Sequence, residues 1–135
     1  MSPVQKVAWT ELIVSVLAIV LVATLYPWLG SAALGGFALL GVLGITPLFL
    51  RRRGNQVVRD ERDVQIEQIA SWFGFGAAYL LLMLSMVAIT LFYSQQQRDV
   101  PTSLLSVLLW SQFAFCYALK GAIALLQYRG TNSAA

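Results

Sequence analysis

Two charged side chains, Glu11 and Lys120, lie inside long apolar stretches of this 135-residue chain and are the residues best placed to do chemistry. Ionisable groups within membrane-length segments are costly to keep there, so they are functional candidates by default. Glu11 follows Lys6 by five residues, which is about 7.5 Å along a helix, and Lys120 precedes Arg129 by nine residues, or about 13.5 Å. These depths are compatible, and we expect an intramembrane ion pair between Glu11 and Lys120 that fixes the register of two helices.

Two other interpretations of these charges stay open. Glu11 could be hydrated near the lipid headgroups while Lys120 extends independently toward the interface. Alternatively, Glu11 could bind a proton or a cation. Glu11 shares a helix face with Ser15 and Ala18, which indicates that this face looks into the protein. A carboxylate far from the lysine amine would exclude the ion pair.

A second group of charges lies between the apolar stretches, because nine of the fifteen charged residues fall between positions 51 and 67. Its acids, Asp60, Glu61 and Asp63, point in different directions on a helix and alternate with arginines, so they do not converge on a metal ion. We expect a solvated network that docks a partner or contacts anionic lipid headgroups. Its members are Arg51, Arg52, Arg53, Arg59, Asp60, Glu61, Arg62 and Asp63. Gly54-Asn55 predicts a turn, and from Val57 a helix is expected to continue into the next apolar segment.

The residue types that are missing exclude several kinds of site. The chain has no histidine, which excludes a His-ligated haem or pigment, a conventional zinc site and a His-based nucleophile system. The single cysteine, Cys116, excludes an intrachain disulfide and is expected to be a small buried apolar residue. No acid, base and nucleophile converge, so we expect neither an enzyme nor a bound cofactor or metal.

The elements that carry these residues are predicted to be membrane-spanning helices. The chain is 59% hydrophobic and 11% charged, against roughly 25% charged in soluble domains. Four apolar segments, at about 7–28, 31–50, 70–93 and 103–128, reach the length of roughly 20 residues that crosses a bilayer. The first is too long for a cleaved signal peptide, so it is expected to be retained. The fold class is therefore all-α, a single membrane domain over 1–135 forming a four-transmembrane-helix bundle, with a charged loop at 51–69.

The basic residues predict the orientation of this bundle. Four spans place both termini and the 51–69 loop on one side of the membrane. Seven basic residues are on that side and only Arg98 on the other; the seven are Lys6, Arg51, Arg52, Arg53, Arg59, Arg62 and Arg129. The positive-inside rule makes that side cytoplasmic. The basic residues border apolar segments, so the expected acidic partner is lipid and not nucleic acid.

Small residues at helical spacing predict where helices pack closely. In the fourth segment they are Ser111, Ala114, Ala118, Gly121 and Ala122, and in the third Ser71, Gly74 and Ala78. Lys120 lies opposite the first of these stripes, near Gln112 and Cys116. Either this polar face or the small-residue face turns into the bundle, and the sequence leaves both open. Small residues of the second segment are spread around an α-helix, which favours packing on more than one side, and Pro47 is expected to kink its end.

The run Asp60-Glu61-Arg62-Asp63, which follows an arginine stop and leads into the third segment, resembles the signature of a family of small bacterial predicted membrane proteins with four spans. That family has no established activity. The resemblance implies its four-span architecture, a bacterial inner membrane, and a structural or docking role for these four positions. Glu11 also resembles the glutamate in the first span of small multidrug exporters, but Lys120 and the long charged loop depart from that pattern.

Two functions follow as expectations. The first is a structural or accessory membrane protein that packs into an oligomer, or with other membrane subunits, in contact with the lipid bilayer and with anionic lipids at the cytoplasmic face. The alternative is a small proton-coupled secondary transporter that acts as a homo-oligomer around Glu11. Transport predicts a water-accessible Glu11 in a substrate-sized cavity, whereas a structural protein predicts an occluded or paired one.

Overall fold

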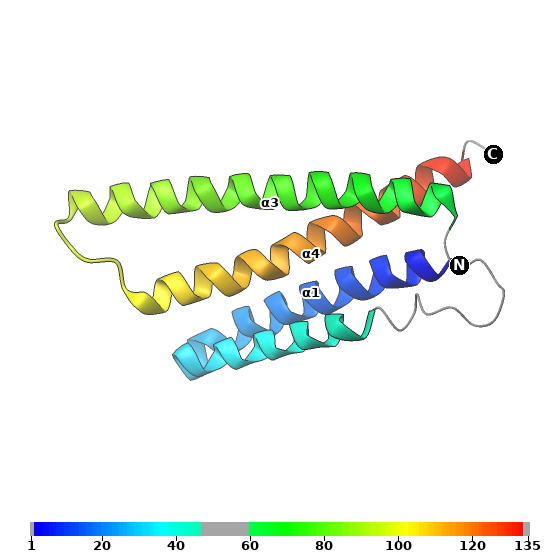
Figure 1. The fold of residues 1–135 in the computed structure, drawn as a ribbon. Coiled ribbons are helices and arrows are strands. Elements are labelled where there is room, and N and C mark those ends of the chain that lie inside the picture. Colours follow the sequence, from blue (N-terminus) through cyan, green and yellow to red (C-terminus); the bar gives the residue numbers. More distant parts are fainter. Residues whose placement is uncertain (1, 47–59, 134–135) are drawn as a thin grey trace.

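The computed structural model describes residues 2–46 and 60–133, and within these ranges all regular secondary structure is helical. The elements are α1 (Pro3–Leu29), the 3₁₀ helix η1 (Gly30–Ile45), α3 (Glu61–Gln95) and α4 (Thr102–Ser133) (Figure 1). The expected all-α class is confirmed. Among the described residues, three stretches are long and apolar enough to cross a membrane: Pro3–Gly44, which joins α1 to η1, Glu61–Gln95 and Thr102–Gly130.

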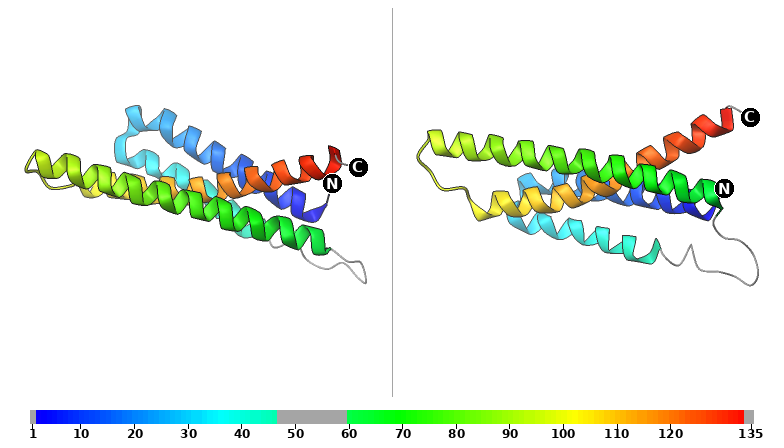
Figure 2. Two further views of the ribbon diagram at one scale, coloured as in Figure 1. Left: turned by 90° about the horizontal axis from the view of Figure 1, so that it is seen from above. Right: turned by 45° about the horizontal axis from the view of Figure 1, so that its top comes forward.

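The helices are arranged in a row with α4 in its middle. α4 packs against both α1 and α3, and η1 packs mainly against α1. Figure 1 shows the first half of α4 between α3 and the α1–η1 hairpin, and in the right view of Figure 2 α4 crosses α3 toward its C-terminal end. The start of α1, the start of α3 and the end of α4 lie at the same end of the molecule. Because α3 makes extensive helix contacts with α4 alone among the described elements, most of its surface stays uncovered.

The chain reverses between α1 and η1 at Gly30. This glycine has a φ of 56°, in the left-handed region that side chains disfavour, and its N–H donates to the Tyr26 carbonyl. Pro27 lies inside the last turn of α1 and removes one backbone donor there. Pro27 and Gly30 together end α1 and direct η1 back along it.

The 3₁₀ geometry of η1 sorts its residues into lines, because three residues complete a turn. Phe37, Leu40 and Leu43 recur every three positions and are buried against α1 and α4. The next line consists of small exposed residues, which we call the η1 small line: Ala32, Gly35, Ala38, Gly41 and Gly44. Small residues also lie on the third line, where Ala33 is buried and a Cβ atom on Gly36 would lie 3.0 Å from Val22 Cγ2 of α1. The expectation that small residues surround this helix assumed α-helical spacing, and in the 3₁₀ helix they occupy two of its three lines. Pro47 and the rest of the predicted 31–50 span lie outside the described residues.

The first residue of α3 is Glu61, later than the sequence predicts. Asp60 is extended, with φ −97° and ψ 174°, and its side chain caps the helix by accepting from the Asp63 N–H at 2.8 Å. The Asp63 carboxylate in turn accepts from the Asp60 N–H at 3.5 Å, which completes a capping box. No helix can continue through an extended Asp60, so the prediction of one helix from Val57 into α3 is wrong.

Two clusters of buried residues form the core. The first joins α1, α3 and α4 near their common end: Val4, Ala8, Ile66, Ala70, Ala124, Leu125 and Tyr128. The second joins α1, η1 and α4: Ala18, Val22, Phe37, Leu40, Leu43 and Ala114. On α1, Glu11 lies between the residues of the two clusters, and on α4 Lys120 does the same. The two charges therefore interrupt an otherwise apolar core.

Candidate functional site

The structure brings Glu11 of α1 and Lys120 of α4 together. Lys120 Nζ donates to Glu11 Oε1 at 2.7 Å, and the side chains are only 5% and 13% exposed for the glutamate and the lysine. The lysine ammonium also lies 5.9 Å from the centre of the Tyr117 ring, within the range of a cation–π attraction. The Lys120 ammonium is thus stabilised by the Glu11 carboxylate of α1 and by the Tyr117 ring, which lies one turn earlier on α4.

Three backbones approach closely at the level of this ion pair. A Cβ atom on Gly121 would lie 2.7 Å from the Ala8 carbonyl oxygen and 2.9 Å from the Leu12 nitrogen. A Cβ atom on Gly74 would lie 2.8 Å from both Cα and N of Lys120. Side chains cannot be placed at these distances, so α1 and α3 each contact α4 where it carries Lys120 and Gly121. The ion pair and the glycines together fix the register of the three helices.

A buried hydroxyl accompanies the pair on the same face of α1. Ser15 follows Glu11 by one turn, is fully buried, and its Oγ has no hydrogen-bond partner among the described residues. A buried hydroxyl without a hydrogen bond lowers the free energy of unfolding by about 1–3 kcal/mol. The polar part of the core therefore extends from Glu11 and Lys120 toward the second apolar cluster.

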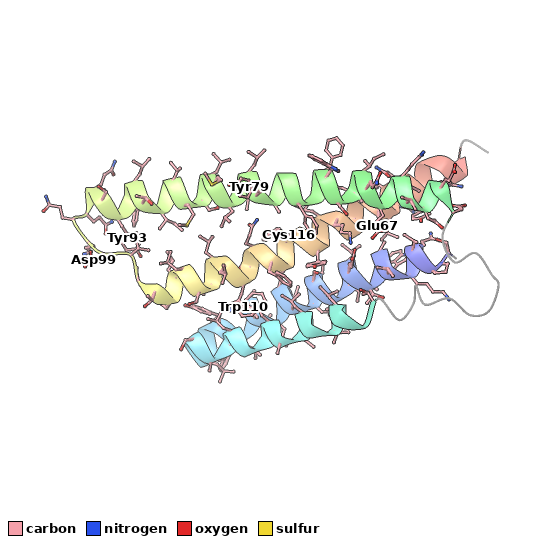
Figure 3. All side chains as sticks on the ribbon, viewed as in Figure 1. Glu67, Tyr79, Tyr93, Asp99, Trp110 and Cys116 are labelled. Atoms are coloured by element: carbon pink, nitrogen blue, oxygen red, sulfur yellow. The ribbon has the colours of Figure 1, made fainter. Side chains whose placement is uncertain are left out.

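Both faces of α4 turn into the protein. On the polar face, the Gln112 side-chain amide donates to the Ala78 carbonyl of α3 and lies 3.8 Å from Cys116 Sγ. Figure 3 places Cys116 on the side of α4 that looks toward α3. On the small-residue face, Ala114 and Gly121 are buried against α1 and η1. The sequence left open which of the two faces of α4 turns into the bundle, and both alternatives assumed that the other face is exposed. In the structure α4 is central, and both faces contact other helices.

A second polar cluster ties together the helix ends at one end of the molecule. Asp63, only 7% exposed, accepts hydrogen bonds from the Tyr128 hydroxyl and from Ser2 Oγ, the latter at 3.5 Å. Ser2 also caps α1, because its Oγ accepts from the Gln5 N–H at 3.2 Å. One carboxylate thus joins the start of α3 to the start of α1 and the end of α4. The expectation that Asp63 belongs to a solvated docking surface is corrected.

A family model of predicted membrane proteins, DUF2178, matches residues 6–126. The chain belongs to this family. No curated protein and no solved structure matches it. The predicted resemblance to a family of membrane proteins is therefore confirmed. The expectation that this chain is a membrane protein is confirmed by the same match. In this DUF2178 chain the match includes the Glu11–Lys120 pair and Asp63, whereas Ser2 and Tyr128 lie just outside it.

The other residues singled out in this DUF2178 chain have mixed positions. Gly74 and Ala78 are buried on the side of α3 toward α4, and Ser71 is partly buried. Ser111, Ala118 and Ala122 are partly buried on α4. Asp60, Glu61 and Arg62 are exposed, so docking at these positions stays a prediction, and Arg51, Arg52, Arg53 and Arg59 lie outside the described residues. In the part of the chain that is described, no group of three or more His, Cys, Asp or Glu side chains could hold a metal ion.

The Ser2–Asp63–Tyr128 cluster is the feature that sequence reasoning missed. Asp60 and Asp63 have the spacing of a capping box, and this signal could have placed the start of α3. Nothing local to Tyr128 predicts its partner, because the hydrogen bond joins residues 65 positions apart.

Proposed function

We propose that this chain is a structural or accessory membrane protein without catalytic chemistry, which packs into an oligomer or a larger membrane complex. The observation that carries the proposal is the state of Glu11. Its carboxylate is buried and lies 2.7 Å from the Lys120 amine. Among the described residues, Glu11 lines neither the hollow at Trp9 and Leu12 nor the hollow at Ile19 and Tyr26 of α1. A glutamate that exchanges protons with a substrate pathway needs water, so an occluded and paired Glu11 supports a role in packing.

The proposed topology has four spans with both termini and the 51–69 loop in the cytoplasm of a bacterium. At about 2.0 Å per residue, the 16 residues of η1 extend about 32 Å, close to the roughly 30 Å of a hydrocarbon core. An α-helix of the same 16 residues would extend only about 24 Å. The extended 3₁₀ geometry therefore supports η1 as a fourth span, antiparallel to α1.

The η1 small line is the proposed packing surface. The exposed face of α3 carries large apolar side chains such as Trp72 and Phe73, which suit contact with lipid tails. The η1 small line instead presents Gly35, Gly41 and Gly44, and a Cβ atom at any of these glycines would meet nothing within 4 Å. Small residues in a line let another helix backbone approach closely in a membrane. The line thus offers a place for a second copy or another subunit.

Cysteine cross-linking in native membranes tests this proposal. In a Cys116→Ala background, we expect Ala38→Cys, on the η1 small line, to form a higher-mass cross-linked species under mild oxidation or with a short bis-maleimide. Leu39→Cys is the matched control, because it is exposed on the same helix but on the next line. Mass spectrometry of the adduct after gentle detergent extraction would tell a second copy from another subunit. Equal cross-linking of the two variants, or none, would argue against this surface.

The transporter alternative is tested separately. Purified chain reconstituted in vesicles should show no proton-linked flux that depends on Glu11. A flux that disappears in Glu11→Gln while the protein stays folded would overturn the structural role.

A further inference from the structure

The hydroxyl group of Ser15 differs from other hydroxyl groups on the helices of this chain. A serine or threonine inside a helix can donate to a backbone carbonyl one turn earlier in the same helix. Five described side chains do so, at 2.7 to 3.1 Å: Thr10, Thr24, Ser85, Thr90 and Ser106. Ser15 Oγ makes no such bond, although the residue has 0% exposure. This hydroxyl is therefore used neither by its own helix nor by bulk solvent.

The ion pair beside Ser15 also has unused hydrogen-bonding positions. The Lys120 ammonium carries three N–H donors, and in the described part of the chain one of them bonds to Glu11 Oε1 at 2.7 Å. The Glu11 carboxylate can accept about four hydrogen bonds, and this one is its contact with a described side chain. A buried ion pair is favourable only when its remaining donors and acceptors are also bonded. The pair therefore requires further partners.

The lysine side chain extends toward Ser15. A Cβ atom on Gly121 would lie 2.9 Å from the Leu12 nitrogen, so the backbone beside Lys120 is level with the turn of α1 that precedes Ser15. The ammonium lies 5.9 Å from the centre of the Tyr117 ring, so the side chain runs toward the start of α4. Because α1 and α4 run in opposite directions (Figure 1), this is the direction of Ser15.

The chemistry of the three groups defines a ligand that would join them. An ammonium only donates, a carboxylate only accepts, and a hydroxyl does either, so the ligand has to accept and donate. The ion pair is neutral as a whole, so the ligand needs no charge. It has to be small, because Ser15 is completely buried. Water meets these conditions, and a buried water typically makes about three hydrogen bonds to groups that would otherwise be unsatisfied.

We propose that one water molecule is bound inside the core, where it accepts from the Lys120 ammonium and donates to Ser15 Oγ and the Glu11 carboxylate. This site is distinct from the packing surface on η1 and does not depend on the structural role proposed above. A single enclosed water also leaves Glu11 without a path to bulk solvent.

Solid-state NMR of the full-length chain in bilayers tests the site. The sequence has two lysines, Lys6 and Lys120, so ¹⁵N at the side-chain nitrogens gives two signals, and Lys6→Gln assigns them. The experiment measures the rate at which magnetisation passes from water protons to each nitrogen. We expect transfer to Lys120, but more slowly than to Lys6, which is exposed.

Two serine substitutions locate the water. Ser15→Ala should remove most of the transfer to Lys120, because the water loses one of its about three partners. It should also lower the midpoint of chemical unfolding, whereas removal of an unsatisfied hydroxyl would raise the midpoint. Ser85→Ala is the matched control and should leave the transfer unchanged, because Ser85 Oγ bonds to the Leu81 carbonyl of its own helix. Circular dichroism verifies that the helices of each variant are intact.

The other outcomes overturn the proposal. Absence of transfer to Lys120, equal transfer in Ser15→Ala, or a higher unfolding midpoint of Ser15→Ala excludes the bound water and leaves the structural role intact. Transfer to Lys120 as fast as to Lys6 shows that bulk water reaches the ion pair. That result also contradicts the occluded Glu11 on which the structural role rests.

Discussion

At the scale of single residues, Glu11, Lys120 and Asp63 are ionisable groups that lie where only a partner makes them tolerable. Glu11 and Lys120 are buried as a pair, and Asp63 is buried beside two donors, Ser2 at the cap of α1 and Tyr128 of α4. An isolated buried charge is costly, whereas a paired one is close to neutral in its effect on stability. The consequences of mutation should therefore depend on which partner remains.

Lys120→Met should destabilise the protein more than replacement of both partners. The single substitution leaves the Glu11 carboxylate buried without its cation, a loss of about 3–5 kcal/mol. Glu11→Met/Lys120→Met leaves no buried charge and should recover most of that loss. Chemical denaturation in detergent, followed by circular dichroism, measures both. With Glu11→Met as the second single variant, a double variant as unstable as the sum of the two single ones would show that the pair is not coupled.

Tyr128→Phe should weaken the helix-end cluster. It removes the hydroxyl that donates to the buried Asp63 and should lower the free energy of unfolding by about 1–3 kcal/mol. Tyr79→Phe is the control, because Tyr79 is exposed on α3 and should change stability by less than about 0.5 kcal/mol. Equal effects of the two substitutions would mean that the Tyr128 hydrogen bond contributes nothing.

At the scale of elements, apolar length predicted the positions of α1, α3 and α4, because a bilayer demands long apolar runs from any helix that crosses it. The sequence did not reveal η1 as a 3₁₀ helix, because its residues were placed with the 3.6-residue repeat of an α-helix. The lines of large and of small residues become visible only with a repeat of three residues. Nor did it place α4 at the centre. Gln112 bonds to α3 while Ala114 packs against η1, and which helix meets each face depends on contacts far apart in the chain.

Two glycines on α3 should respond to alanine in opposite ways. Gly74→Ala places a Cβ atom 2.8 Å from the Lys120 backbone and should destabilise the protein by about 1–3 kcal/mol. Gly76→Ala meets nothing within 4 Å, so the better helix propensity of alanine should leave stability unchanged or raise it by up to about 1 kcal/mol. Thermal unfolding of both variants decides the matter, and similar losses would contradict a close α3–α4 approach at Gly74.

At the scale of the whole molecule, the row of helices is held together by α4 and by the Ser2–Asp63–Tyr128 cluster. The ion pair, the close contacts of Gly74 and Gly121, and the helix-end cluster each use a residue of α4. The sequence predicted that Glu11 and Lys120 have compatible depths, because helical rise converts residue number into distance. It could not predict the Asp63 cluster, which needs three helix ends to meet.

Thiol labelling should report the orientation of α3 directly. In a Cys116→Ala background, Ser94→Cys lies near the end of α3 and Gln65→Cys near its start, and both positions are exposed. An impermeant maleimide should label Ser94→Cys in intact bacteria, and Gln65→Cys only after the inner membrane is opened. The reverse pattern would invert the proposed topology.

The central place of α4 has a consequence for the order of synthesis. A ribosome makes α1, η1 and α3 before Lys120 exists, so the Glu11 carboxylate enters the membrane without its cation. During that interval α1 can pack against η1, whereas α3 is in the membrane without α4, the helix that it packs against. Arrival of α4 then supplies the lysine, the glycine contacts and the Tyr128 hydroxyl together. A nascent chain halted before Thr102 is therefore the form that quality-control proteases should recognise.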